Sequence, residues 1–258
     1  MATDWAGMAP AYASSFGRLC SGTVPAILDA ASVVPTGGKV LDVGTGTGTV
    51  AAALDAAGFD TVGVDADEGM VDFAAGVHRG PTFVAGALPS LPFADAEFDL
   101  VVANFVVNHT LKPRAVAREL ARVTRADGVV VVTIWPSVPV SPMNELWGDV
   151  VRDSGAVVPT GTRLPAHDDF ERSRDGLDGL LAEAGLTDVR VDELSWDFTI
   201  SAADLWQGVE AGIANIGGTY RHQDEPGRRA MRAAYGARAG WGDLSFPASA
   251  LVGVARAA

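Results

Sequence analysis

The sequence predicts an α/β protein with a doubly wound, mostly parallel sheet. Short apolar runs of strand length alternate with amphipathic helical stretches up to residue 136, and a glycine-rich segment joins the first strand to its helix. Strands and helices in this order form a parallel sheet through right-handed crossovers. We expect five such strands, and two further strands after residue 175.

The composition indicates one acidic, globular domain. The 258 residues are 48% hydrophobic and 20% charged, and the formal net charge is −13. No cluster of Lys and Arg forms a basic stripe that could follow phosphates, so we expect no nucleic-acid partner. The single cysteine, Cys20, cannot form an intramolecular disulfide and has no zinc-ligand companions, which favours a buried apolar role.

The beginning of the chain lacks the basic and apolar regions of a secretory signal. The longest apolar runs, residues 100–107 and 129–135, are too short to span a bilayer. These features predict a cytoplasmic protein without a membrane partner, whereas the oligomeric state stays unknown.

The N-terminal residues have the spacing of helices. Ala11–Leu19 and Val24–Val34 carry apolar residues three and four positions apart. Tyr12 and Phe16 lie on one helical face, and core packing is the expected role of Phe16.

The segment Val40–Gly48 is the most informative stretch. It contains a short apolar strand with Asp42, then glycines at every second position, and then an alanine-rich helix over residues 49–57. Because glycine has no Cβ, a ligand can touch bare backbone at the N-terminus of that helix. A dinucleotide fingerprint would require a third glycine where Thr49 stands. A tight strand-to-helix turn without a ligand is the alternative interpretation.

Two motifs together carry a resemblance to a known family. The strand and glycines of Val40–Gly48 resemble the first motif of class I S-adenosylmethionine-dependent methyltransferases. Residues 86–93, followed by Asp95 and Phe98-Asp99, are similar to a segment of small-molecule methyltransferases. The resemblance covers residues 38–135. It implies S-adenosyl-L-methionine as cofactor and in-line methyl transfer to an O, N or C atom of a small-molecule acceptor.

The resemblance also implies a Rossmann-like, seven-stranded sheet with an antiparallel last strand and helical cap insertions. We expect a single domain, divided into an N-terminal helical lid (1–34), a cofactor-binding core (35–136), cap insertions (137–175 and 201–245) and the rest of the core (176–200 and 246–258).

A second strand, Thr61–Asp65, ends in a carboxylate about twenty residues after the first glycine. Such a carboxylate can accept hydrogen bonds from both hydroxyls of a ribose. Alternatively, Asp65 or Asp67 caps the next helix, and Asp67 suits that role better. With the family resemblance, the expected cofactor contacts are Asp42, Gly44, Thr45, Gly46, Asp65, Ala66, Met70, Ala87, Leu88, Asn104 and Phe105.

The third strand, Thr82–Ala85, precedes a departure from the family pattern. The acidic residue that usually accepts the adenine amino group is replaced by Ala87. One side-chain hydrogen bond, about 0.5–1.5 kcal/mol, is therefore absent, and we expect backbone groups of Ala87 and Leu88 to meet the adenine edge.

The fourth strand, Phe98–Asn104, runs into residues that should face the reacting methyl group, because ligands of open α/β sheets bind beyond the carboxyl ends of the strands. Asn104 is expected beside the methionine moiety. His109 is a candidate general base, with an ordinary pKa near 6.5. The alternative is that His109 only packs in the loop, because methyl transfer often needs no enzymic base.

After the amphipathic helix Lys112–Val123, Asp127-Gly128 is expected to turn into a fifth strand, Val129–Trp135. The remaining elements are expected as helices over residues 144–152, 177–184 and 205–213 and after Pro226, and as strands over residues 189–200 and 249–256.

Aromatic side chains of the lid and cap are candidates for substrate contact, although each is more often a core residue. The main candidates are Tyr12, Trp147 and Trp206, and Tyr220 and Trp241 are further aromatic candidates in the cap. His167, next to Asp168 and Asp169, is a second candidate base. Three consecutive loop residues do not fix a coordination polyhedron, so no metal is expected.

Two other classes of function remain open at the level of sequence. A nicotinamide-dependent oxidoreductase would also place an acidic residue at Asp65, and a non-catalytic protein that binds an adenosyl ligand would need no base.

Overall fold

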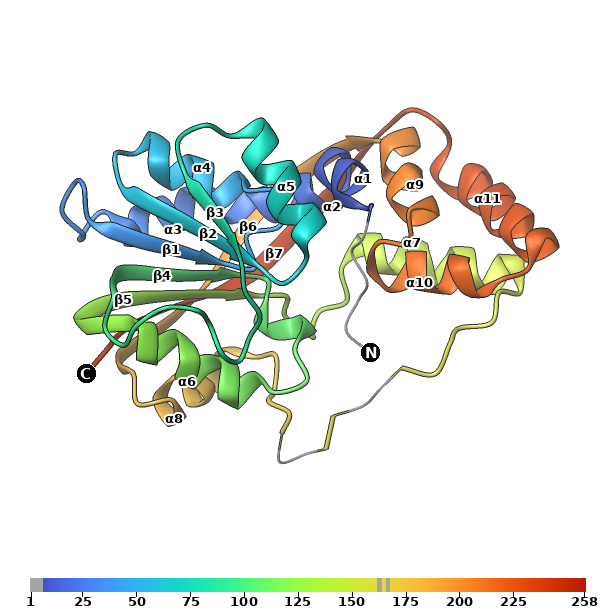
Figure 1. Cartoon of the computed structure of the whole chain (residues 1–258). Helices are drawn as coiled ribbons and strands as arrows, with labels where there is room; N and C mark the ends of the chain where they lie inside the picture. Colours follow the sequence, from blue (N-terminus) through green and yellow to red (C-terminus); the bar gives the residue numbers. More distant parts are fainter. Residues whose placement is uncertain (1–6, 162–163, 166–167) are drawn as a thin grey trace.

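The computed structural model describes residues 7–161, 164–165 and 168–258. A seven-stranded sheet has the strand order β3-β2-β1-β4-β5-β7-β6 (Figure 1). The strands are β1 (Lys39–Val43), β2 (Asp60–Asp65), β3 (Thr82–Ala85), β4 (Phe98–Asn104), β5 (Thr124–Ile134), β6 (Thr187–Ser201) and β7 (Asp243–Arg256). The first five pair in parallel, and β7 runs antiparallel to both β5 and β6. This confirms the predicted fold class.

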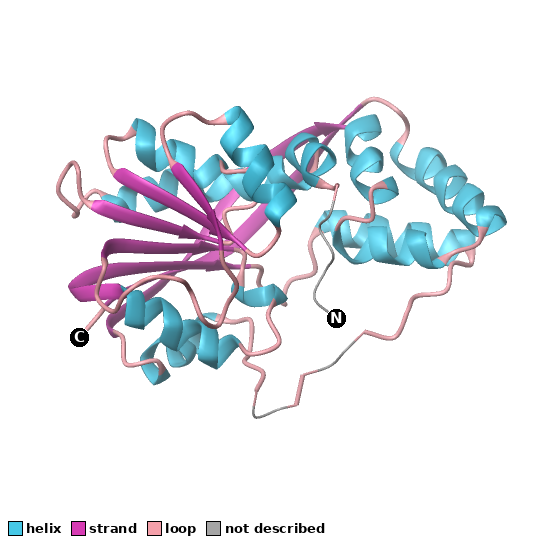
Figure 2. Cartoon of the chain, viewed as in Figure 1, coloured by secondary structure: helices cyan, strands magenta, loops and turns pink. Residues whose placement is uncertain are grey.

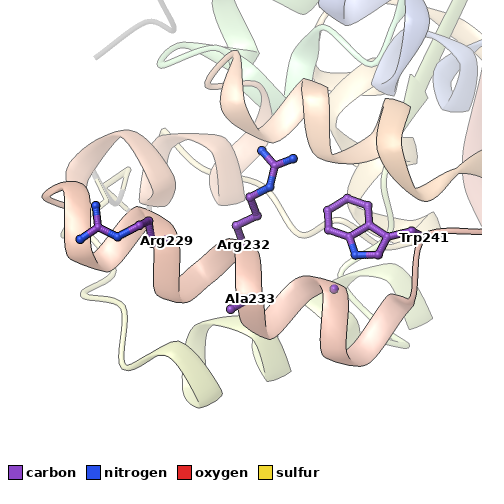
Figure 3. Close-up of a pocket in the computed structure, with 5 residues that line it drawn as sticks. Arg229, Arg232, Ala233 and Trp241 are labelled. Atoms are coloured by element: carbon purple, nitrogen blue, oxygen red, sulfur yellow. The ribbon is translucent and has the colours of Figure 1, made fainter.

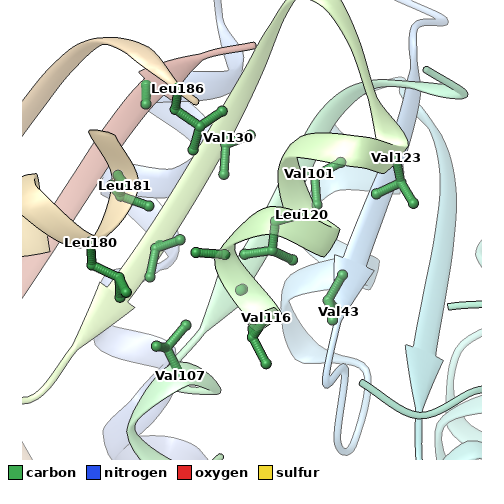
Figure 4. Packing of buried hydrophobic residues seen from close by; sticks show 14 of the residues in the cluster. Val43, Val101, Val107, Val116, Leu120, Val123, Val130, Leu180, Leu181 and Leu186 are labelled. Carbon is green, nitrogen blue, oxygen red and sulfur yellow. The ribbon is translucent and has the colours of Figure 1, made fainter. Parts of the chain in front are cut away.

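Helices cover both faces of the sheet (Figures 1 and 2). On one face lie α3 (Val24–Ala31), α4 (Thr49–Ala56) and α5 (Glu68–Val77), and on the other lie α6 (Pro113–Val123) and α8 (Arg174–Glu183). Alternate strand residues point to opposite faces. Thus Val101 packs in the cluster with α6 and α8, whereas Val102 packs in the cluster with α3 and α4 (Figure 4).

The N-terminal segment is more broken than predicted. The single helix expected over Ala11–Leu19 is wrong, because the backbone leaves helical geometry at Ser15 (φ −121°, ψ −101°). The segment therefore consists of α1 (Ala9–Ser14), α2 (Phe16–Cys20) and the 3₁₀ helix η1 (Ser21–Thr23). Phe16 is buried, as predicted.

A cap of four helices lies beyond the carboxyl ends of the parallel strands (Figure 1). It contains α7 (Pro142–Ser154), α9 (Ala202–Glu210), α10 (Ala214–His222) and α11 (Glu225–Ala239). The helix predicted over residues 205–213 is present as α9, but its predicted end is wrong, because the helix ends at Glu210 and Gly212 adopts φ +84°. Ion pairs from Arg238 to Asp149 and Asp153 join α11 to α7.

Strands β6 and β7 connect the cap to the sheet. Strand β7 begins at Asp243, six residues before its predicted start at Ser249. Only Leu251–Arg256 pair with β5, whereas β7 pairs with β6 from Asp243 onward. The two strands therefore extend past the sheet as an antiparallel ribbon that ends in the cap (Figure 1).

The fifth strand also differs in detail from the prediction. It begins at Thr124, and the turn expected at Asp127-Gly128 lies inside it as a bulge. Phe98 pairs with Thr124, and the next pair is Leu100 with Val129, so an advance of two residues along β4 corresponds to five residues along β5. Asp127 accordingly adopts φ +59°.

None of the helices in the described ranges combines the length and the apolar character that crossing a bilayer requires.

Replacing Leu120 by Ala tests the packing of α6. Its side chain is fully buried between α6 and the sheet (Figure 4), so Leu120→Ala should lower the free energy of unfolding by about 2–5 kcal/mol. Chemical denaturation measures the change. Leu111→Ala, at a side chain that is 49% exposed, is the control and should cost less than about 0.5 kcal/mol. Equal losses in both variants would contradict this packing.

Candidate active site

The turn from β1 to α4 contains three glycines with positive φ: Gly44 (+65°), Gly46 (+53°) and Gly48 (+81°). A Cβ at Gly44 would lie 2.5 Å from Val106 Cγ2, and a Cβ at Gly48 would lie 2.8 Å from the His78 ring. At Gly46 the nearest atom would be 3.7 Å away, in the ring of Tyr12. The protein's own packing therefore requires two of the glycines, whereas Gly46 leaves backbone open at the N-terminus of α4.

Asp42 stabilises this turn from below. Its side chain is buried, and Oδ2 accepts hydrogen bonds from Thr45 Oγ1 (2.7 Å) and from the backbone N–H of Ala51 (3.1 Å) in the first turn of α4. Burial raises the pKa of Asp42 to about 7, and the two hydrogen bonds act in the opposite direction. Asp42 and Thr45, both predicted cofactor contacts, thus bond to each other beneath the turn.

Asp65 connects the end of β2 to the same turn. Its Oδ2 accepts a hydrogen bond from the N–H of Gly46 (2.8 Å), and its Oδ1 accepts one from the N–H of Asp67 (3.0 Å). A carboxylate oxygen can accept two hydrogen bonds, so both oxygens retain capacity for hydroxyl donors. Burial raises the pKa of Asp65. Asp67 caps α5 by accepting from the N–H of Met70 (2.9 Å), which confirms the role that the sequence favoured for Asp67.

Tyr12 covers the glycine turn from the side of the N-terminal helices. Its ring lies beside Gly46 and also beside Gly17, where a Cβ would be 3.1 Å from ring atoms. The Tyr12 hydroxyl and the Cys20 thiol share a hydrogen bond. Burial raises the pKa of Tyr12 well above its ordinary value and that of Cys20 to about 11, so both groups stay protonated near neutral pH.

At the end of β4, Asn104 bonds to the protein itself. Its Oδ1 lies 2.8 Å from Thr23 Oγ1 and 2.6 Å from Thr133 Oγ1, and its Nδ2 donates to the carbonyl of Cys20 (3.3 Å). Thr23 Oγ1 also lies 2.9 Å from the Cys20 carbonyl, so its single proton is shared between the two oxygens. One N–H of the amide is left for a ligand.

Phe105 follows with φ +57°, a conformation that is rare for a bulky residue. Its backbone N–H donates to the hydroxyl and the carbonyl of Thr133, and its ring stacks on Trp135 at 3.8 Å with an interplanar angle of 11°. Thr133 and Trp135, which contact Phe105, were not among the predicted site residues. Their position in the sequence could have identified them, because Thr133 lies at the carboxyl end of β5 and Trp135 directly after that strand, beside the end of β4.

The candidate base His109 ends the 3₁₀ helix η2 (Val107–His109) between β4 and α6. Its side chain reaches solvent, but the surrounding protein desolvates the ring and lowers the pKa of His109 below 6.5. The imidazole is therefore neutral at pH 7, which is the form that accepts a proton.

The remaining predicted cofactor residues surround β2 and β3. Met70 is 3% exposed, while Ala66 and Ala87 are exposed and Leu88 is half-buried. The Ala87 carbonyl accepts a hydrogen bond from the N–H of Ser90 (3.1 Å), which closes a turn after β3.

Two predicted substrate contacts lie inside the cap instead of at the strand ends. Trp147 and Trp206 both stack on Tyr235, with ring centroids 5.5 Å and 4.9 Å apart, and Trp206 is 1% exposed. The indole N–H of Trp206 donates to Glu210 (2.9 Å). These contacts bury both tryptophans in the cap's core, away from Asp65.

The cap also has a concave surface on α11, lined by Arg229, Arg232, Ala233, Gly236 and Trp241 (Figure 3). Arg232 pairs with Glu210 and lies over the ring of Trp241, while Arg229 pairs with Glu225. This surface is separate from the glycine turn (Figure 1). In the described ranges no three His, Cys, Asp or Glu side chains converge as metal ligands. His167, the second candidate base, lies outside the described residues.

Comparison with known proteins decides the family. A family model described as "Methyltransferase domain" matches residues 41–132, from β1 to β5. A demethylmenaquinone methyltransferase of Beutenbergia cavernae is 38% identical over 170 residues, which are 62% of this chain and 70% of that protein. The chain belongs to the class I S-adenosylmethionine-dependent methyltransferases.

Other proteins are also similar to this methyltransferase. A demethylmenaquinone methyltransferase of Paenarthrobacter aurescens is 32% identical over 176 residues, or 63% of this chain and 67% of that protein. An uncharacterized methyltransferase of Mycolicibacterium gilvum is 38% identical over 129 residues, or 46% and 50% of the two chains. The structure of the YcgJ protein from Bacillus subtilis shares the fold, with a TM-score of 0.56 and 21% identity over 90% of this chain and 97% of that chain.

The cofactor of the methyltransferase is S-adenosylmethionine, and the site suits it. The backbone at Gly46 is open at a helix N-terminus, and the Asp65 carboxylate lies one hydrogen bond away from it. Membership of this family decides against the nicotinamide-dependent oxidoreductase and the non-catalytic binder.

The raised pKa of Asp42 makes stability depend on pH. Between about pH 4 and pH 7 the folded carboxyl holds its proton more tightly than the unfolded chain does, so its contribution to the free energy of unfolding falls as the pH rises. Asp42→Asn keeps an acceptor oxygen for Thr45 and Ala51 but does not titrate. Between pH 4.5 and pH 7.5, the free energy of unfolding of the variant should rise relative to that of wild type by on the order of a few kcal/mol, as measured by chemical denaturation. Parallel pH profiles of the two proteins would show that Asp42 titrates normally.

Proposed function

We propose that this methyltransferase transfers the methyl group to a small-molecule acceptor held between the strand ends and the helical cap. The observation that carries the proposal is the position of Trp135. Its ring stacks on Phe105 at the end of β4, and it also packs against the hydrophobic core of the cap. An acceptor in contact with this pair would lie between sheet and cap, where water is excluded from the reacting atoms.

The cofactor residues divide by position into three groups. Gly44, Thr45 and Gly46 form the turn at the N-terminus of α4, and Asp65 offers its remaining lone pairs to the ribose hydroxyls. Ala66, Met70, Ala87 and Leu88 surround the position expected for the adenine ring. Asn104 and Phe105 lie on the side of the methionine moiety. S-adenosylmethionine supplies an electrophilic methyl group on a sulfonium, and the protein's part is to align the acceptor and exclude water.

The proposed acceptor class is an aromatic ring that can act as a nucleophile, such as a reduced quinone. The relatives from Beutenbergia cavernae and Paenarthrobacter aurescens carry the name demethylmenaquinone methyltransferase, which supports this choice. The aromatic cluster of Phe105, Trp135 and Trp196 supports it as well, since flat rings stack favourably at offset or tilted angles. We further propose that His109 removes a proton from the acceptor, because it is neutral at pH 7 and follows β4.

Cofactor binding tests the role of Asp65. Asp65→Asn removes the charge that favours hydroxyl donors, so the Kd for S-adenosylhomocysteine should rise about 10-fold to 100-fold in isothermal titration calorimetry. The matched control is Asp67→Asn, because Asn caps a helix as well as Asp does and the Kd should change less than about twofold. An unchanged Kd in Asp65→Asn would place the ribose elsewhere.

Turnover tests the role of His109. His109→Ala should lower kcat by about 10²-fold or more, while the Kd for S-adenosylhomocysteine stays the same. In wild type, kcat should fall as the pH drops below the pKa of His109, which lies under 6.5. His222→Ala, at an exposed histidine of α10, serves as control. A rate equal to wild type in His109→Ala would remove this residue from the mechanism.

The acceptor class is tested by methyl transfer from cofactor labelled in its methyl group. The panel consists of a demethylmenaquinol, simple phenols, small amines and carboxylic acids. We expect label in the quinol or phenol products and none in the amines or carboxylic acids. Transfer to amines alone would overturn the aromatic acceptor but not the methyltransferase function.

A further inference from the structure

Asn104 lies where three parts of the protein meet: the end of β4, the end of β5 and the N-terminal helices. Its amide contacts Thr23 in η1, Thr133 in β5 and the carbonyl of Cys20, the last residue of α2. Thr23 and Thr133 are fully buried. Their hydroxyls depend on protein partners, because water does not reach them.

One arm of this network leads to the glycine turn. The Cys20 carbonyl accepts from Asn104, and the Cys20 thiol shares a hydrogen bond with the Tyr12 hydroxyl. The Tyr12 ring in turn lies against Gly46. Asn104 ends β4 and Gly46 lies in the turn that follows β1, so the N-terminal helices connect the two strand ends.

The other arm leads to the aromatic pair. Thr133 Oγ1 accepts from the backbone N–H of Phe105 (2.9 Å) and lies 2.6 Å from Asn104 Oδ1. The Phe105 backbone has φ +57°, which needs such support from its surroundings, and its ring stacks on Trp135.

We propose that Asn104 is a positioning residue that holds the N-terminal segment Ala9–Thr23 against the end of β4, so that Tyr12 stays over the glycine turn and slows the release of cofactor. The amide acts through its protein partners Thr23, Thr133 and Cys20. These contacts leave only one amide N–H for a ligand. The proposal rests on binding of the family's cofactor and not on the identity of the acceptor. It can therefore be tested even if none of the acceptors in the panel is methylated.

The first test is the dissociation rate of S-adenosylhomocysteine, measured by stopped-flow displacement with excess S-adenosylmethionine. Asn104→Ala removes the amide oxygen that Thr23 and Thr133 contact, so dissociation should be about 5-fold to 100-fold faster. Thr23→Val should have an effect in the same direction, and the two changes should be non-additive, because they remove the same contact. Thr219→Val is the control. It removes a buried threonine hydroxyl that bonds Asn215 within the cap, and its dissociation rate should equal that of wild type.

Asn104→Asp gives a test that a purely structural role does not predict. A protonated carboxyl keeps one acceptor oxygen for the threonines and one O–H donor for the Cys20 carbonyl, whereas a carboxylate faces that carbonyl without a donor. The ratio of dissociation rates, variant over wild type, should therefore approach one at low pH and rise as the introduced carboxyl ionises. The groups that face this region, Tyr12, Cys20, Asp42 and Asp65, titrate in both proteins and largely cancel in the ratio.

Hydrogen exchange of the protein without cofactor separates local release from general destabilisation. In Asn104→Ala the amides of residues 9–23 should exchange faster, whereas those of β1 and β4 should keep the wild-type rate. Faster exchange throughout the sheet, or a dissociation ratio that does not change with pH in Asn104→Asp, would overturn the proposal. If Asn104→Ala does not fold, Thr23→Val and Asn104→Asp still decide between the outcomes.

Discussion

Two carboxylates, the buried Asp42 and the half-buried Asp65, fix the turn between β1 and α4, and the site depends on this constraint. Asp42 binds the turn from within through Thr45 and the first turn of α4, while Asp65 binds it from the neighbouring strand through the N–H of Gly46. The turn needs glycine at three positive-φ positions, and such a backbone has few interactions of its own. The carboxylates supply those interactions, and the absence of a Cβ at Gly46 leaves room for the cofactor beside the backbone.

The same end of the sheet also connects core and cap. Strands β6 and β7 run past the sheet and carry the cap helices α9, α10 and α11, and Trp135 packs between Phe105 and the cap's core. Because α7 and α11 are joined by the ion pairs of Arg238, the cap has its own internal support. Its position relative to the glycine turn therefore depends on the ribbon of β6 and β7 and on the segment around Trp135.

Much of the sheet could be predicted from the sequence, because strands buried on both faces are short apolar runs between glycines and polar residues. Thr82–Ala85 and Phe98–Asn104 agree with β3 and β4 at both ends. The predictions fail where tertiary contacts override the local pattern. The apolar spacing around Ser15 suits one helix, yet the chain bends there. The first half of β7 contains Pro247, and a proline within a run argues against a strand, which hides the ribbon.

The site shows the same division. The spacing of glycines and carboxylates along the chain is typical of such a turn, so Gly46 and Asp65 could be selected from the sequence alone. The partners of Asn104 could not, since Thr23 is 81 residues away in the chain and meets the amide only in the folded protein. Trp147 and Trp206 stay predictions as substrate contacts: aromatic residues in a cap are candidates for that role, and here their rings stack on Tyr235 in the cap's core.

A crystal structure of the protein with S-adenosylhomocysteine tests the central claim most directly. The account predicts that the ribose hydroxyls lie within hydrogen-bond distance of Asp65 and that the amino-acid part of the ligand lies against the backbone at Gly46. A ligand bound elsewhere, with Asp65 still bonded only to backbone N–H groups of the protein, would contradict the account.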